Sequence, residues 1–163
     1  MTQPDMSLTS FERDARHILG NEGVVTDDRT RRLMSQDIWA RGEMASLVLR
    51  PESTDDLQNI VRLAHKYGVN LNPRGGGMSY TKAYTPDRDH VGSLDLSRLN
   101  RIVEINTDDM YVTVEAGVTW KDLHDALTPL GVRTPFWGPL SGLTSTIGGG
   151  LSQNNAFFGA GLY

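Results

Sequence analysis

The feature that most constrains this chain is a strand–helix–strand pattern that ends in three consecutive glycines. Residues 45–50 hold a short apolar run with no length for a helix, which predicts a buried strand. A helix is predicted next, because Ser53 is a suitable N-cap, apolar residues recur at helical spacing, and Gly68 ends the pattern. Residues 69–74 predict a second strand that leads directly into the glycines at 75–77. This order predicts parallel pairing of the two strands with a right-handed crossover.

The segments on either side carry simpler local signals. Helices are indicated by capping residues and apolar periodicity, strands by short apolar or alternating runs, and a hairpin by the polar residues between the last two strands. The expected elements are a helix over 9–19, a brief strand at 24–25, a helix around 30–35, strands over 91–96, 102–105 and 111–115, and a helix from Thr119 to Pro129. The predicted fold class is therefore α+β, with a small parallel βαβ subdomain followed by the start of a second, more antiparallel subdomain.

Composition excludes several classes of protein. Sixteen Lys plus Arg against 20 Asp plus Glu give a net charge of -4, which argues against nucleic-acid binding. The chain has no Cys, and its four His show no metal-ligand spacing, so no metal site and no thiol chemistry are expected. No apolar run is long enough for a membrane-spanning helix, and residues 1–10 lack the regions of a signal peptide. The expected location is cytoplasmic.

The final thirty residues, 134–163, contain no Asp, Glu, Lys, Arg or His, yet they are rich in Gly, Ser, Thr and Asn. An exposed segment of this length normally carries charges, and a membrane span would not carry Pro139 and Asn154. The segment therefore predicts backbone that packs against something partly polar.

Two glycine clusters suggest what that partner is. Three glycines at the end of a strand remove every Cβ, so a ligand can approach the backbone and successive N–H groups can converge on an anion such as phosphate. Arg74 and Ser79 flank this cluster and would add a charge and a hydroxyl. For the second cluster, residues 148–150, close packing of a loop on a sheet explains the glycines as well as ligand contact does. The spacing matches neither the dinucleotide-binding GxGxxG motif nor the GxxxxGK[ST] phosphate loop.

Three motifs in order give the chain a family resemblance. They are Pro73-Arg74-Gly75-Gly76-Gly77-Met78-Ser79-Tyr80, then Val114-Glu115-Ala116-Gly117-Val118-Thr119-Trp120, then Ser145-Thr146-Ile147-Gly148-Gly149-Gly150. Together they resemble the FAD-binding domain of the FAD-linked oxidases of vanillyl-alcohol oxidase type, which include glycolate oxidase subunits and D-lactate dehydrogenases. The resemblance covers residues 45–163, so residues 1–44 are expected to be a helical lead-in.

The resemblance implies a set of FAD-binding residues, with FAD between the two subdomains. The first glycine loop would hold the pyrophosphate, and the later segment would approach the ribityl chain and the isoalloxazine ring. The implied residues are Arg74, Gly75, Gly76, Gly77, Met78, Ser79 and Tyr80 for the first loop, and Pro139, Ser141, Ser145, Thr146, Gly148, Gly149 and Ser152 for the later segment.

Two departures from the family qualify what is expected. Some members carry at the position of Met78 a His that bonds covalently to the flavin, so FAD attachment here is expected to be noncovalent. Family members are also longer, and the side chains that act on the substrate are expected beyond Tyr163. We therefore name no catalytic residue, and we expect the FAD-binding domain to be incomplete at its C-terminal end and this chain to be inactive by itself.

The expected function is a flavin-dependent oxidation of a carbon that bears a hydroxyl, with hydride transfer to flavin N5. A 2-hydroxy acid is the expected small-molecule substrate, and oxygen, a quinone or a protein carrier would accept the electrons. A homo-oligomer is compatible with the sequence. The alternatives are a noncatalytic nucleotide-binding or scaffold module, and a sugar-nucleotide reductase of the same superfamily.

Overall fold

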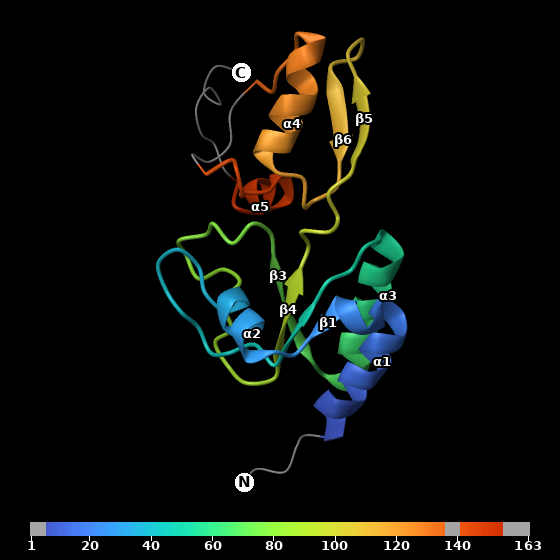
Figure 1. The fold of residues 1–163 in the computed structure, drawn as a ribbon, viewed down its shortest axis with the longest axis vertical. Helices are drawn as coiled ribbons and strands as arrows, with labels where there is room; N and C mark the ends of the chain where they lie inside the picture. The colour runs from blue at the N-terminus through green and yellow to red at the C-terminus, as the bar shows by residue number, and fades with distance from the viewer. Residues whose placement is uncertain (1–5, 136–140, 155–163) are drawn as a thin grey trace. The chain divides into compact units, whose positions relative to one another are not determined.

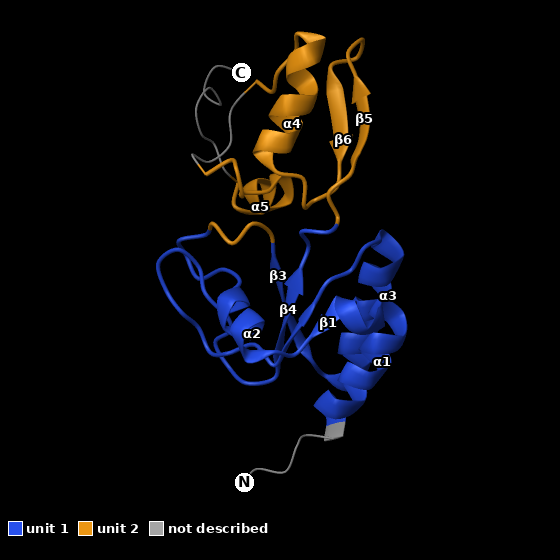
Figure 2. Ribbon diagram, viewed as in Figure 1, with its two compact units in different colours: residues 1–74, 79–98 blue, residues 75–78, 99–163 orange. Residues whose placement is uncertain are grey.

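The computed structural model describes residues 6–135 and 141–154 (Figure 1). The chain forms two compact units (Figure 2). Unit 1 comprises residues 1–74 and 79–98, and unit 2 comprises residues 75–78 and 99–163. Unit 1 contains a mainly parallel sheet with helices, and unit 2 contains an antiparallel hairpin with helices. This arrangement confirms the predicted α+β class.

The sheet of unit 1 has the order β1-β2-β4-β3. Strands β2 (Leu47–Leu49), β4 (Val91–Asp95) and β3 (Asn70–Arg74) are parallel, and β1 (Val24–Val25) is antiparallel to β2. The prediction that β2 and β3 pair with each other is wrong, because β4 lies between them. Every residue of β4 is buried, which suits a central strand. The polar β3 contains Pro73, which has no N–H to donate, and takes the edge.

Helices cover both faces of this sheet. Helices α1 (Met6–Gly23) and α3 (Thr54–Tyr67) lie on one face, and the short α2 (Asp28–Met34) lies on the other (Figure 1). The core between the sheet and helices α1 and α3 includes Phe11 and Ile60, both fully buried. Helix α1 runs past its predicted end, but Gly20, where the helix was expected to stop, has φ 71° and marks a kink.

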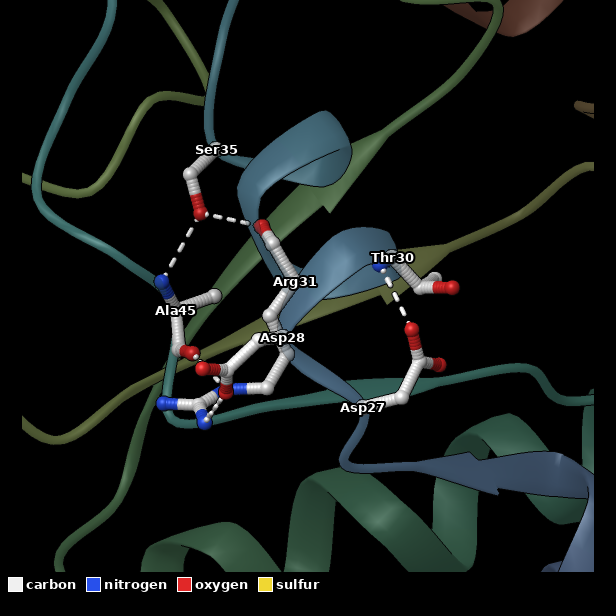
Figure 3. Close-up of polar contacts among 6 residues, drawn as sticks. All are labelled: Asp27, Asp28, Thr30, Arg31, Ser35 and Ala45. Atoms are coloured by element: carbon white, nitrogen blue, oxygen red, sulfur yellow. Dashed lines mark hydrogen bonds and ion pairs between the residues drawn. The ribbon is translucent and has the colours of Figure 1, made fainter.

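Helix α2 is tied to the start of β2 by side chains (Figure 3). Asp27 caps the helix by accepting a hydrogen bond from the Thr30 N–H at 2.9 Å. Arg31 donates through Nε to the Ala45 carbonyl at 2.7 Å. The Ser35 hydroxyl accepts from the Ala45 N–H at 2.8 Å and donates to the Arg31 carbonyl at 2.6 Å. These bonds fix the point at which the chain enters the sheet.

Unit 2 is built on a hairpin of β5 (Ile102–Asn106) and β6 (Tyr111–Val114), with α4 (Trp120–Leu127) packed against it. Its core consists of Val118, Trp120, Leu123, Leu127 and Ile147, all buried. A 3-10 turn follows at Thr128–Leu130, and a last helix, α5, spans Ile147–Ser152. Among the described residues, no helix is both long and apolar enough to cross a membrane.

The sequence did not predict α5, because three successive glycines disfavour a helix. Tertiary contacts stabilise this one. Thr146 caps it by accepting a hydrogen bond from the Gly149 N–H at 3.2 Å, and Ile147 is buried in the core of unit 2.

Candidate functional site

Arg74 ends β3 with a positive charge that no acidic side chain neutralises among the described residues. Its register partner on β4 is Asp95, but that carboxylate accepts a hydrogen bond from Arg50 Nε at 3.0 Å instead. The Arg74 guanidinium lies 5.3 Å from the centre of the Tyr84 ring, and its buried Nε has no hydrogen-bond partner. Burial raises the pKa of Tyr84, which keeps the phenol neutral beside this cation. The guanidinium is therefore available to an anion.

The glycine loop, residues 75–78, follows immediately. No described residue accepts a hydrogen bond from its four successive backbone N–H groups. Gly77 has φ 74°, a left-handed conformation that glycine adopts without strain. Successive N–H groups without acceptors in a turn are typical of an anion-binding loop.

The glycine loop packs against a second loop of unit 2, residues 141–146. A Cβ on Gly75 would collide with the Thr146 hydroxyl, and one on Gly76 would collide with the Thr144 carbonyl, both well inside the 3.0 Å that real Cβ atoms respect. At Gly76 the obstacle is backbone, so close packing of protein on protein requires glycine there. At Gly75 it is the Thr146 hydroxyl, which caps α5. The two glycine-rich motifs, about seventy residues apart, are brought together in unit 2.

The motif at residues 114–120, the second of the family resemblance, joins the same cluster. The Trp120 N–H donates to the Ser145 carbonyl at 3.2 Å, the Ile147 N–H to Val118 at 2.8 Å, and the Gly148 N–H to Ala116 at 3.0 Å. A Cβ on Gly148 would collide with Ala116, and one on Gly150 would lie 3.2 Å from Trp120 Nε1. At these two glycines the packing explanation is therefore sufficient, whereas Gly149 meets only the Thr146 hydroxyl, at 3.1 Å.

The hydroxyl groups of Ser145, Thr146 and Ser152 already have protein partners. Ser141 accepts three bonds of 2.9 Å on its carbonyl, from the Thr144 N–H, the Ser145 N–H and the Ser145 hydroxyl. The Ser152 hydroxyl donates to the Gly148 carbonyl at 2.8 Å. Ser145 is 6% exposed and Thr146 is 3% exposed, so these side chains mainly shape the loop.

Two other predicted residues belong to unit 1 and not to this cluster. Ser79 and Tyr80 belong to unit 1, where Ser79 accepts from the Thr81 N–H at 3.1 Å and Tyr80 is 62% exposed. Met78 is half-buried at the end of the glycine loop. Pro139 lies outside the described residues.

Two contributors to the site carry no signal in the sequence that would predict them. Thr144 limits the space at Gly76 through its backbone carbonyl, which no sequence pattern reveals. Asp37 binds the chain just after the glycine loop, at Lys82, and the 45 positions between them leave no local signal.

The cluster of unit 2 offers bare backbone and neutral hydroxyls. The described part of the glycine loop, the second loop and α5 has no ionisable side chain, so a neutral ring system could be bound there without burying an unpaired charge. The N–H groups of the glycine loop suit a pyrophosphate. A parallel βαβ unit that leads into such a loop defines a domain that binds a phosphate-containing cofactor.

Comparison with known proteins identifies the family. The sequence model described as the FAD binding domain matches residues 45–163, and the chain belongs to this family. Its cofactor is FAD, and the resemblance seen in the three motifs is confirmed. The residues present fit that cofactor, since within the described part of the chain the N–H groups of the glycine loop have no acceptor and Arg74 has no acidic partner.

Relatives and solved structures agree with this assignment. The chain is 33% identical over 118 residues to the mitochondrial D-lactate dehydrogenase (cytochrome) of Kluyveromyces lactis, covering 68% of this chain and 20% of that protein. It is 30% identical over 163 residues to the 1'-carboxy-chondrochloren decarboxylase of Chondromyces crocatus, covering 99% and 29%. An alkyldihydroxyacetonephosphate synthase structure shares the fold, with a TM-score of 0.81 at 23% identity over 91% of this chain and 29% of that one. The chain thus spans less than a third of the length of each.

Proposed function

We propose that this chain is the FAD-binding part of a flavin-dependent oxidoreductase that oxidises a hydroxyl-bearing carbon of a 2-hydroxy acid. One observation carries the proposal: four successive N–H groups, with no acceptor among the described residues, directly follow Arg74, which pairs with no described carboxylate. The likeness to a D-lactate dehydrogenase supports the choice of substrate class. The flavin would supply hydride-accepting chemistry, and the protein's share would be binding and orientation.

We assign the residues of the chain to parts of the cofactor. The N–H groups of residues 75–78 would hold the pyrophosphate, with Arg74 balancing its charge and Ser79 and Tyr80 completing the loop. The second loop and the start of α5 would line the ribityl chain and the flavin ring. The residues assigned to this second part are Pro139, Ser141, Ser145, Thr146, Gly148, Gly149 and Ser152.

Substitution of Arg74 tests the phosphate site. Arg74→Met keeps an unbranched apolar stem against Tyr84 but removes the charge, so FAD affinity should fall about tenfold or more. Stability without FAD should change by no more than about 1 kcal/mol, because the variant loses the contact of the charge with the Tyr84 ring but no hydrogen bond of the buried Nε. Arg88→Met is the matched control, since that exposed side chain pairs with the adjacent Asp87 and with no other described residue. Equal FAD affinity in wild type and Arg74→Met, measured by flavin fluorescence titration, would place the phosphate elsewhere.

We propose further that FAD is bound noncovalently, because the thioether of Met78 cannot form the bond that a His forms at this position. Acid precipitation of the flavin-loaded protein should leave the flavin in the supernatant. Yellow colour that stays with the pellet would contradict the assignment.

A second candidate follows from the decarboxylase relative, whose alignment reaches across 99% of the chain. As a second candidate function, the same FAD site would serve the decarboxylation of a carboxylic acid. Anaerobic mixing of D-lactate or glycolate with an FAD-loaded longer chain, which includes the part expected to act on the substrate, distinguishes the two. Loss of the flavin absorbance supports hydroxy-acid oxidation, and an unchanged flavin spectrum favours the second candidate.

A further inference from the structure

Asp37 lies in the connection between α2 and β2, before the part of the chain that the family model matches. Its carboxylate accepts three backbone hydrogen bonds. Oδ1 accepts from the Trp39 N–H at 2.8 Å and from the Ala40 N–H at 2.6 Å, which closes a tight loop. Oδ2 accepts from the Lys82 N–H at 2.8 Å, across 45 positions of sequence. One side chain thus joins two separate loops of unit 1.

The second of these loops is the segment that directly follows the glycine loop. Its first residue, Ser79, accepts a hydrogen bond on its carbonyl from the Ile38 N–H at 3.2 Å. Its last residue, Lys82, has φ 57°, a left-handed conformation that a non-glycine residue keeps only when its surroundings hold it. Residues 79–82 are therefore anchored at both ends by residues 37 and 38.

The electrostatics keep Asp37 in its accepting form. Burial acts to raise the pKa of the carboxyl, but hydrogen bonds from the N–H groups of Ala40, Lys82 and Trp39 and the nearby Lys82 charge outweigh it, so the pKa is lowered. The carboxylate is ionised at neutral pH, and both of its oxygens accept.

We infer that Asp37 is a positioning residue for FAD, which holds the segment after the glycine loop in the conformation that binds the pyrophosphate. The inference rests on the proposed role of residues 75–78. A loop whose far end is free would sample other conformations, and the measured affinity would fall in proportion to the population that remains competent to bind.

Asp37→Asn separates the two tasks of the carboxylate. The amide oxygen can still accept from Trp39 and Ala40, while the amide nitrogen replaces the oxygen that faces the Lys82 N–H and cannot accept from it. The loop around residues 37–40 should persist and only the link to the second loop should be lost. Asp87→Asn is the matched control, because it removes an exposed carboxylate that pairs with the adjacent Arg88.

Two measurements on the purified protein test the inference. Titration with FAD should show about a tenfold weaker Kd for Asp37→Asn and an unchanged Kd for Asp87→Asn. Hydrogen–deuterium exchange without FAD should show faster exchange in residues 79–82 of Asp37→Asn, with the core helix α3 protected as in the wild type.

Each outcome decides a different point. An unchanged Kd in Asp37→Asn, or exchange that rises throughout unit 1, would overturn the positioning role. An equal loss of affinity in Asp87→Asn would reduce the effect to overall charge and also overturn it. If the wild type fails to bind FAD, the proposed function fails, whereas the exchange measurement still decides whether Asp37 anchors the loop.

Discussion

Replacement of Gly76 by Ala tests the packing of the two loops of unit 2. The new Cβ would collide with the Thr144 carbonyl and lie 3.1 Å from the Ser145 Cα. Both obstacles are backbone, so no side-chain rotation relieves them. They belong to a turn whose N–H groups bond to the Ser141 carbonyl, and Ser145 in turn accepts from the Trp120 N–H.

The magnitude follows from these contacts. Overpacking against rigid neighbours costs about 1 to 3 kcal/mol, and a backbone hydrogen bond lost when the turn shifts costs about 1 kcal/mol more. We expect Gly76→Ala to lower the free energy of unfolding by about 2 to 4 kcal/mol.

Urea unfolding followed by tryptophan fluorescence measures this change, because Trp120 lies in the core of unit 2. Gly149→Ala is the matched control. That helical glycine faces only the Thr146 hydroxyl at 3.1 Å, and alanine favours a helix, so its stability should stay within about 1 kcal/mol of the wild type. If Gly76→Ala unfolds at the same urea concentration as the control, the close approach of the two loops is wrong.

Three further predictions concern stability. Phe11→Ala should lower the free energy of unfolding by about 3 to 5 kcal/mol in urea, because the ring is fully buried and contacts Tyr67 edge-on; a loss below about 1 kcal/mol would contradict this core. Gly77→Ala should lower the free energy of unfolding by about 1 kcal/mol in the same assay, because φ of this residue is 74° and alanine is strained there. An unchanged free energy of unfolding would mean that the folded chain does not keep this φ. Hydrogen bonds from Arg101 lower the pKa of Glu115. They therefore stabilise the folded state at pH values above the ordinary pKa of a Glu carboxyl, and this stabilisation is lost as the pH falls through the lowered pKa of Glu115. The melting temperature of Arg101→Met should therefore fall less than that of the wild type as the pH is lowered. An equal fall in both proteins would show that the pair of Arg101 and Glu115 does not cause it.

The sequence alone determined the elements whose signals are local. Helix α3 begins after the Ser53 cap and ends at Gly68, as predicted, because its cap bonds and apolar face involve residues a few positions apart. The Thr119 cap of α4 and the hairpin of β5 and β6 were predictable for the same reason, and the structure contains both. The cofactor class was also predictable, because the glycine motifs stand uninterrupted in the sequence.

The tertiary structure decided what depends on distant residues. It placed β4 between β2 and β3, formed α5 from glycine-rich sequence, and set the backbone of Thr144 against Gly76. It also joined Asp37 to Lys82. These contacts depend on the shape and burial of whole elements. Many of them involve backbone carbonyl and N–H groups, which almost every residue has, so the sequence does not indicate which of these groups will meet. Local patterns therefore predicted a loop that binds phosphate, and the resemblance of three motifs to a known family predicted FAD. Only the packing of the folded chain shows which backbone groups shape and hold the glycine loop.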